Sequence, residues 1–256
     1  MIPVPQEGCA WITGASSGIG RALALRMARA GWTVGVTARR VEVLEELARE
    51  ADGARGRIVP APCDVTDRAA VIEALAALEK EAGPVRLAVL NAGIYEPDRA
   101  DTLDPDTFAK TVNLNLIGTV GCLAALMPDW IERKQGHLVV VSSVAGYSGL
   151  PRSLSYGATK AALINFCEGL KFDFDRLDLA VQVVCPGFVR TPATDRNDFK
   201  MPALMEVEDA AEAIYRGLDP KRFEITFPKR FTYVLKVLRC LPHRLYFPLV
   251  KRMTGQ

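Results

Sequence analysis

The chain has 256 residues, of which 49% are hydrophobic and 24% charged, so it can bury a sizeable core in one or two domains, and we expect one. Its net charge is +2; the six cysteines follow no paired or metal-like spacing and the two histidines have no ligand partners, which argues against a metal site. Residues 1–7 lack the basic start and apolar core of a signal peptide, so we expect a cytoplasmic protein.

Short apolar runs rich in β-branched residues alternate along the chain with amphipathic stretches of helical length. This alternation is typical of βαβ units, and it predicts an α/β fold with a parallel sheet. The predicted strands are residues 9–13, 33–37, 58–61, 87–90, 137–141 and 180–184. The predicted helices are residues 19–30, 41–51, 68–82, 108–131, 156–176 and 207–217.

One stretch inside the fourth predicted helix, residues 111–128, has no charged residue and is long enough to raise the question of a membrane span. Asn113 and Asn115 lie within it, and it stands between two predicted strands. We therefore expect a helix that is buried against the sheet.

A glycine-rich turn, residues 13–20, joins the first predicted strand to the first predicted helix. At such a junction the free N–H groups and the helix dipole meet a pyrophosphate. Gly14 permits the turn, Gly18 lets phosphates approach, and Gly20 allows close helix packing. The spacing Gly-x-x-x-Gly-x-Gly differs from the usual dinucleotide fingerprint. An ordinary tight turn remains the alternative.

The residues after the second predicted strand indicate which dinucleotide is bound. Ala38 stands where an NAD enzyme places a carboxylate for the ribose 2′-hydroxyl, and Arg39 and Arg40 follow. The Arg39 guanidinium suits a 2′-phosphate, so NADP(H) is favoured over NAD(H). The alternative is that both arginines are a solvated start of the next helix, which fits Arg40 better than Arg39.

Tyr156 and Lys160 lie four residues apart in a predicted helix, so that they share one face. The Lys160 ammonium then favours the ionised form of the phenol, which becomes a usable proton donor and acceptor. Ser143, thirteen residues before Tyr156, supplies a hydroxyl to hold a substrate oxygen. The alternative is an amphipathic helix pair without chemistry.

Taken together, these motifs resemble the short-chain dehydrogenase/reductase family over about residues 8–192, which implies a doubly wound Rossmann fold. Where the family commonly has Asn-Asn-Ala-Gly, this chain has Leu90 followed by Asn-Ala-Gly, a departure that leaves the turn intact. The residues that carry the resemblance are the turn 13–20, Asp64, Val65, Asn91, Ala92, Gly93, Asn115, Ser143, Tyr156, Lys160, Pro186, Gly187 and Thr191.

The resemblance implies a carbonyl reductase chemistry in which NADPH delivers a hydride and Tyr156 gives its proton to the developing alkoxide, which Ser143 stabilises. Lys160 also binds the nicotinamide ribose, and Asn115, at a kink of the fourth helix, holds a water that restores the proton. A buried asparagine satisfied by backbone groups is the alternative for Asn115. The implied catalytic residues are Asn115, Ser143, Tyr156 and Lys160.

The resemblance also places Asp64 and the Val65 backbone at the adenine, and Pro186, Gly187 and Thr191 at the nicotinamide. Residues 64–67 read equally well as the start of a helix, which gives Asp64 a capping role. The expected cofactor-binding residues are Gly14, Ser16, Ser17, Gly18, Ile19, Gly20, Arg39, Arg40, Asp64, Val65, Asn91, Ala92, Gly93, Tyr156, Lys160, Pro186, Gly187, Val189 and Thr191.

We expect residues 1–220 to form the catalytic domain, including a substrate lid at about residues 193–205. The candidate wall residues of the lid are Phe199, Met201, Leu204 and Met205. Methionine and phenylalanine at these positions equally suit packing on the core.

Residues 221–256 form a basic extension with nine Lys or Arg and one acidic residue, Glu224, giving 9 − 1 = +8 against 23 − 29 = −6 for the rest. Residues 229–241 and 245–253 both alternate cations with apolar residues, a pattern that favours peripheral contact with an anionic membrane through residues 229–253. The alternative is that their apolar face covers the substrate cleft or a neighbouring subunit. No recognition motif accompanies the charge, so we expect no nucleic-acid partner.

The sequence therefore predicts an NADPH-dependent oxidoreductase that interconverts a carbonyl and a secondary alcohol on a lipophilic small molecule. A regulatory or membrane-associated scaffold that binds cofactor without turnover remains an alternative. A sugar-nucleotide epimerase is a weaker one, because it needs a longer substrate domain and a different glycine spacing. The resemblance further implies a homodimer or homotetramer built through the fourth and fifth helices.

Overall fold

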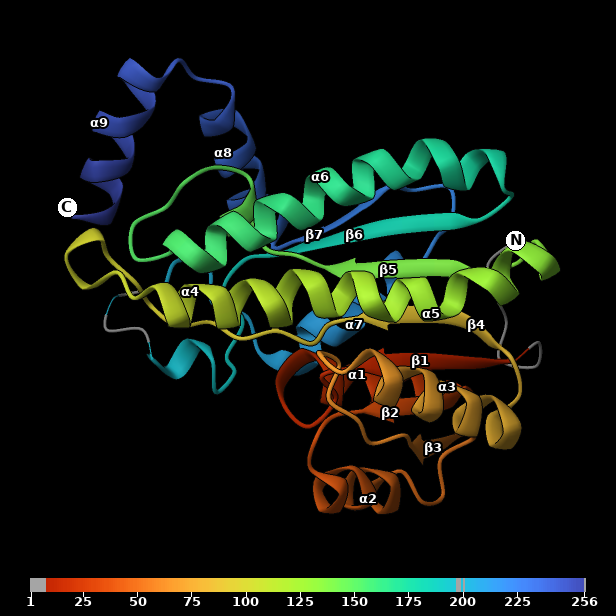
Figure 1. Cartoon of the computed structure of the whole chain (residues 1–256). Helices are drawn as coiled ribbons and strands as arrows, with labels where there is room; N and C mark the ends of the chain where they lie inside the picture. Colours follow the sequence, from red (N-terminus) through yellow and green to blue (C-terminus); the bar gives the residue numbers. More distant parts are fainter. Residues whose placement is uncertain (1–7, 197–198, 200, 256) are drawn as a thin grey trace.

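A parallel sheet of seven strands organises the computed structural model, which describes residues 8–196, 199 and 201–255 (Figure 1). The strand order is β3-β2-β1-β4-β5-β6-β7, so the direction of winding reverses between β1 and β4. This confirms the predicted doubly wound fold. The strands are β1 (Cys9–Thr13), β2 (Thr33–Thr37), β3 (Arg57–Pro60), β4 (Val85–Leu90), β5 (His137–Val141), β6 (Ala180–Pro186) and β7 (Glu224–Phe227).

Helices cover both faces of the sheet because successive strand side chains point to opposite sides. Cys9 and Trp11 of β1 pack under α3, α5 and α6, whereas Ala10 and Ile12 pack under α1, α2 and α7 (Figure 1). The helices are α1 (Gly18–Arg29), α2 (Val41–Glu50), α3 (Arg68–Ala82), α4 (Pro105–Val112), α5 (Gly118–Arg133), α6 (Leu154–Arg176), α7 (Val207–Gly217), α8 (Lys229–Arg239) and α9 (His243–Thr254).

The fourth predicted helix is interrupted. It consists of α4, a π-helical turn at Asn113–Ile117, and α5. By length and composition this continuous run, Pro105–Arg133, is long and apolar enough to cross a membrane. Its buried side chains, among them Leu126 and Trp130, pack against the sheet, as predicted.

The sequence prediction missed β7. This strand has only four residues and begins with a charged one, Glu224, so it lacks the long apolar run of the others. It pairs in parallel with β6, and its Ile225 and Phe227 are buried. The predicted division between residues 220 and 221 therefore leaves one strand of the sheet on the side of the extension.

The extension is fastened to the loop between β5 and α6. The Glu224 carboxylate accepts a hydrogen bond from the Tyr147 hydroxyl and forms an ion pair with Lys236 of α8. The Tyr246 hydroxyl of α9 donates to the Gly149 carbonyl oxygen at 2.7 Å. Figure 1 shows α8 and α9 standing together beside the N-terminal end of α6. Leu235 and Leu238 of α8 and Tyr246 and Val250 of α9 join the main core, which supports the interpretation that part of the apolar face packs on this chain itself.

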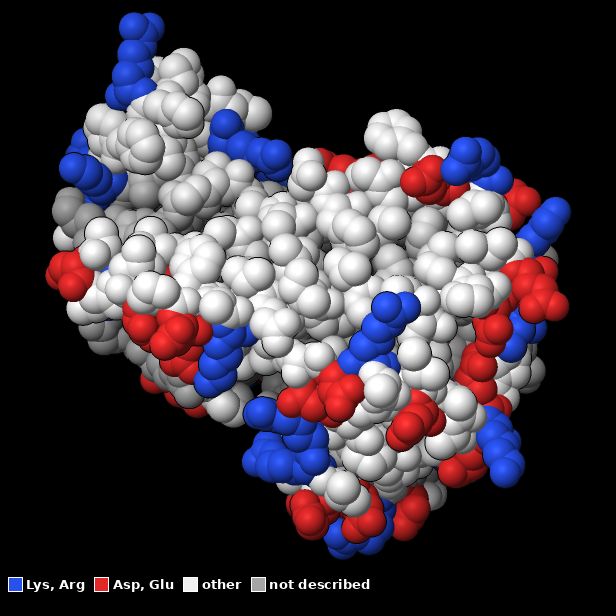
Figure 2. Space-filling view, in the orientation of Figure 1, with Lys and Arg blue, Asp and Glu red and all other residues white. Residues whose placement is uncertain are grey.

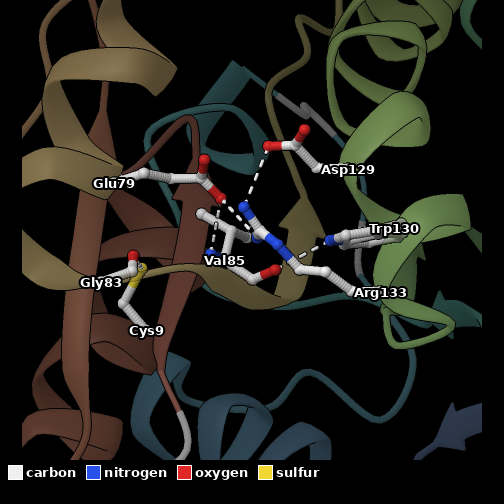
Figure 3. Close-up of polar contacts among 7 residues, drawn as sticks. All are labelled: Cys9, Glu79, Gly83, Val85, Asp129, Trp130 and Arg133. Carbon is white, nitrogen blue, oxygen red and sulfur yellow. Dashed lines mark hydrogen bonds and ion pairs between the residues drawn. The ribbon is translucent and has the colours of Figure 1, made fainter.

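A polar cluster ties α3 and α5 to Val85, the first residue of β4, at the amino-terminal end of that strand (Figure 3). The Glu79 carboxylate accepts hydrogen bonds from the Val85 amide at 2.9 Å and from Arg133 at 3.3 Å. The buried Trp130 indole donates to the Val85 carbonyl oxygen at 2.8 Å. These contacts fix the position of β4 along its strand direction. They therefore also fix the position of the residues that follow β4 in the chain.

Candidate active site

Four loops meet at the carboxyl ends of β1, β4, β5 and β6, where an open α/β sheet binds its ligands. They contain the glycine-rich turn, Asn91 to Gly93, Ser143, and the segment from Pro186 to Thr191. The fold thus brings together sequence motifs that are far apart in the chain.

Steric constraints in the glycine-rich turn require glycine at three positions. Gly14 has a φ of +67°, and an added Cβ would lie 2.7 Å from the Ala92 Cα. A Cβ on Gly20 would lie 2.5 Å from the Gly14 carbonyl oxygen. Gly18 has a φ of +55°, and its Cβ would lie 3.1 Å from Thr191 Cγ2. Thr191, which we expected at the nicotinamide, therefore lies next to the turn.

The turn leads into a helix end that suits an anion. Helix α1 begins at Gly18; its capping residue, Ser17, makes no side-chain capping bond, and the first turn contains no acidic residue. The side-chain amide nitrogen of Asn91 donates hydrogen bonds to the backbone carbonyl oxygens of Thr13 and Gly14, each at 3.1 Å. The structure therefore places Asn91 as a support of the turn, and leaves the helix N–H groups and dipole for a phosphate.

Arg39 and Asp64, which the sequence led us to expect at the adenine, lie close enough for the charge of one to act on the other. The Asp64 carboxylate accepts hydrogen bonds from the amide and hydroxyl of Thr66, at 2.9 and 2.7 Å. These bonds lower its pKa, and the charge of the exposed Arg39 lowers it further. Asp67, not Asp64, caps α3. Arg40 is the residue immediately before α2, as the alternative interpretation of that residue supposed.

Two of the predicted cofactor residues, Val65 and Val189, can offer only backbone atoms to a ligand. Val65 and Val189 are 7% and 3% exposed, because their side chains belong to the two halves of the core. Ser17 is exposed at the turn, and Ser16 and Ile19 are half-buried beside it.

Tyr156 and Lys160 lie one helical turn apart in α6, as predicted. The Lys160 ammonium is 5.4 Å from the centre of the Tyr156 ring, and it donates a hydrogen bond to the Val141 carbonyl oxygen at 2.8 Å. The Ser143 side chain lies close enough to the Tyr156 hydroxyl to lower the pKa of the phenol. The pair and the serine thus form one contiguous group.

The ionisation of this group differs from the expectation. Burial raises the pKa of Tyr156 to about 12, and the Ser143 side chain opposes this rise only in part. Burial also lowers the pKa of Lys160 to about 8. The expected lowering of the phenol pKa by Lys160 is not found, because the ammonium lies on the ring side and is directed to Val141. At neutral pH the phenol keeps the proton that a general acid needs.

Asn115 lies in the π-helical turn, where the sequence led us to expect a kink, and it is fully buried. Its side-chain oxygen accepts from the Ile94 amide at 2.8 Å, and its nitrogen donates to the Ile94 carbonyl oxygen at 3.0 Å and to Thr159 at 3.2 Å. Its amide is therefore satisfied by backbone groups and a hydroxyl. A Cβ on Gly93 would lie 3.1 Å from the Asn115 oxygen and 3.6 Å from Lys160 Nζ, so these residues meet around one glycine.

Sequence reasoning missed Asp98. Its buried carboxylate accepts hydrogen bonds from the backbone amides of Leu154 at 2.6 Å and Ser155 at 2.7 Å, and thereby caps the helix that carries Tyr156. Ser153, the residue that precedes the helix, makes no capping bond. The capping residue comes from 56 positions upstream, so no local sequence signal pointed to it.

Aromatic side chains gather beside the expected nicotinamide position. The Phe188 ring lies 5.7 Å, centre to centre, from both Phe199 and Phe231. A Cβ on Gly187 would lie 3.0 Å from Phe231 of α8. Helix α8 therefore borders the site, as the alternative interpretation of the extension supposed.

The predicted lid is described in part, since residues 197, 198 and 200 lie outside the described residues. Of the candidate wall residues, Phe199 contacts Phe188. Met205 pairs with Val189 through backbone hydrogen bonds and packs on the core. Met201 and Leu204 are half-buried.

Known proteins share this architecture. A family model described as short chain dehydrogenase matches residues 8–201. An uncharacterized oxidoreductase of Myxococcus xanthus is 38% identical over 244 residues, which are 95% of this chain and 96% of that protein. A short-chain dehydrogenase from Sphingobium yanoikuyae, solved with NADPH, has a TM-score of 0.78 and 27% identity, and covers 86% of this chain and 88% of its own. A 3-oxoacyl-(acyl-carrier protein) reductase from Brucella melitensis with bound NAD also has a TM-score of 0.78, with 28% identity and coverage of 86% and 89%.

Proposed function

Because the chain belongs to the short-chain dehydrogenase family, and is therefore a dehydrogenase/reductase, we propose that it interconverts a carbonyl and a secondary alcohol with NADPH as the preferred cofactor. The observation that carries the proposal is the grouping of Ser143 beside the Tyr156 hydroxyl, with Lys160 one turn along the same helix and its ammonium 5.4 Å from the centre of the Tyr156 ring. It stands at the sheet edge where the glycine-rich turn presents the N-terminus of α1.

The residues present fit a nicotinamide dinucleotide. A dinucleotide bound there supplies a hydride to the carbonyl carbon. Tyr156, which keeps its proton at neutral pH, donates that proton to the carbonyl oxygen, and Ser143 orients the same oxygen. Lys160 holds positive charge beside the phenol and returns a proton to it, while Asn115, whose amide is hydrogen-bonded to the Ile94 backbone and to Thr159, fixes the neighbouring segment. Each turnover thus adds a hydride and a proton across the C=O bond.

Replacing Tyr156 with Phe tests the general acid. Turnover should fall at least 100-fold while NADPH binding, measured by fluorescence, stays within about threefold. Tyr95→Phe is a matched control, because the Tyr95 ring packs 5.1 Å from Tyr156 without belonging to the proposed proton path. Retained activity in Tyr156→Phe would refute the assignment. Bound NADPH without turnover by the unaltered protein on any carbonyl would favour the scaffold alternative.

The preference for NADPH rests on Arg39. This guanidinium is exposed, follows Ala38 and acts on Asp64, which supports a role in binding a 2′-phosphate. Arg39→Ala should weaken NADPH binding by at least tenfold and leave NADH almost unchanged. Arg40→Ala is the matched control, since it alters an adjacent exposed cation at the start of α2. An equal loss in both variants would mean that the arginines act only through general charge.

The substrate is proposed to be lipophilic because Phe188, Phe199 and Phe231 gather beside the nicotinamide position. NADPH oxidation across a panel graded from small polar ketones to long-chain and steroidal ones tests this. Turnover should be confined to the apolar end of the panel. Preference for the small polar ketones would contradict it.

We also propose a homo-oligomer assembled through the fourth and fifth predicted helices, which correspond to the continuous run of α4 and α5 and to α6. Ile117, Val120 and Ile131 of this region are exposed and share one apolar side of the helix. Val120→Glu should reduce the mass measured by light scattering, and an unchanged mass would exclude this surface.

The six cysteines are free thiols in the described residues, which supports a cytoplasmic setting.

A further inference from the structure

The outer surface of the C-terminal extension combines exposed apolar residues with cations. Within residues 233–253, Val237 is 66% exposed, Met253 57% and Phe247 56%. Soluble proteins expose such side chains singly, so a concentration of them indicates an interaction surface. The other exposed apolar residues of α8 and α9 are Tyr233, Val234, Leu245 and Leu249.

These residues are arranged by helical geometry into faces that point away from the core. On α8, Arg230, Val234 and Val237 recur at intervals of four and three, while Leu235 and Leu238 on the other side are buried. The contact with this chain thus uses only one side of α8.

Helix α9 repeats the pattern. Leu245, Leu249 and Met253 recur every four residues and are exposed, whereas Tyr246 and Val250 are buried against the loop between β5 and α6. Both helices therefore present a second apolar strip that residues 8–196, 199 and 201–255 leave exposed.

Charge identifies the kind of partner. No acidic residue follows Glu224, and Glu224 itself is paired with Lys236. Figure 2 shows the lobe of α8 and α9 at the upper left as blue and white, without red. The exposed cations of the lobe are Lys229, Arg230, Arg239, Arg244, Lys251 and Arg252.

We propose that this surface of α8 and α9 docks on an anionic lipid bilayer. A bilayer interface takes apolar side chains and cations from the same helix, because the apolar groups enter the acyl boundary while the cations stay at the headgroups. A second copy of this chain is disfavoured, since a twofold contact would place the cations of one copy against those of the other.

The docked position has a consequence for access to the site. The inner side of α8 carries Phe231, which packs on Phe188 beside the catalytic edge. One helix thus meets lipid on its outside and borders the substrate mouth on its inside. Resting on the proposed function, this means that a lipophilic carbonyl reaches the site from the bilayer and not only through water.

Co-sedimentation of the full chain with phosphatidylcholine vesicles, with and without phosphatidylserine, tests the docking without any turnover. We expect binding only when phosphatidylserine is present, and weaker binding as salt is added. Val237→Asp combined with Leu249→Asp should abolish it. Phe172→Asp is the matched control, because Phe172 is 81% exposed but lies on α6.

A second pair of variants tests the charge alone. Arg244→Gln with Lys251→Gln should weaken vesicle binding about thirtyfold, because each cation near an anionic surface contributes a several-fold gain in affinity. The control variant Arg55→Gln with Lys80→Gln removes two exposed cations that lie outside the C-terminal extension, and it should change vesicle binding little. NADPH binding confirms that every variant is folded.

Three results would overturn the proposal. The first is no binding to phosphatidylserine vesicles, and the second is equal binding by the variants and their controls. The third combines two observations: the parent protein does not bind vesicles, and the double variant Val237→Asp with Leu249→Asp loses an oligomer that the parent forms. That result would make the surface an interface between copies of this chain. Failure of the whole carbonyl panel would instead refute the proposed reaction and leave the vesicle result standing.

Discussion

The capping of α6 by Asp98 leads to a prediction that couples stability to catalysis. Asp98→Ala removes both hydrogen bonds to the helix start, and Ser155, one of the two donors, is fully buried, so water cannot take over. A hydrogen bond to a charged group contributes about 1.5–3 kcal/mol, and the two are not independent. We expect the free energy of unfolding to fall by about 3 kcal/mol. Asp98→Asn keeps one acceptor and should lose about half of that.

The catalytic effect follows from the position of the cap. Tyr156 lies in the first turn of α6, directly after the two capped amides, so a loosened turn displaces its phenol. We expect kcat to fall about 10- to 100-fold, in line with the cost of small displacements of a reacting group. The glycine-rich turn is untouched, and KM for NADPH should stay within about twofold.

Urea unfolding followed by circular dichroism, together with steady-state kinetics, provides both measurements. Asp104→Ala is the matched control, because Asp104 caps α4 in the same way but is exposed and holds no catalytic helix. It should destabilise less and leave kcat unchanged. The reasoning would be refuted if Asp98→Ala destabilised no more than Asp104→Ala, or if its kcat matched that of the unaltered enzyme.

Three further predictions use other parts of the structure. Carbonyl reduction should decline as pH rises through about 8, where Lys160 loses its proton, and a pH profile flat to pH 10 would contradict a role for its charge. Gly20→Ala should abolish NADPH binding in a fluorescence titration, because its Cβ would lie 2.5 Å from a backbone oxygen, whereas Gly169→Ala, with nothing within 4 Å, should stabilise α6 by about 0.5–1 kcal/mol. Lys236→Met should cost about 1 kcal/mol in urea unfolding by removing the ion pair with Glu224, and no change would show that the pair is fully screened.

The elements that could be predicted from the sequence are those with a strong local pattern. The strands at Cys9–Thr13, Thr33–Thr37 and His137–Val141 agree to the residue, because each is a buried apolar run between polar turns. Strand β7 lacked such a run. Its position in the sheet depends on the hydrogen-bonded pairing with β6, a tertiary contact that cannot be predicted from the pattern of its own four residues.

The site shows the same division. Spacing along one helix was enough to place Tyr156 beside Lys160, and the turn was recognisable from its glycines. The ionisation of the pair was not predictable, since it depends on burial by residues from other elements. Asp98 was missed for a related reason, because its partners lie 56 and 57 positions away.

The bonds from Asn91 to Thr13 and Gly14 connect residues 78 and 77 positions apart, across the pairing of β1 with β4. Contacts that close such a long loop form late in folding, after the entropy of the intervening chain has been lost. The phosphate cradle therefore comes into existence only when the two halves of the sheet have joined. Under the proposed function, a dinucleotide would bind only chains that have completed this step, and it would shift the folding equilibrium toward them by mass action. The proposed cofactor would therefore act on the protein as a stabilising ligand as well as a reactant.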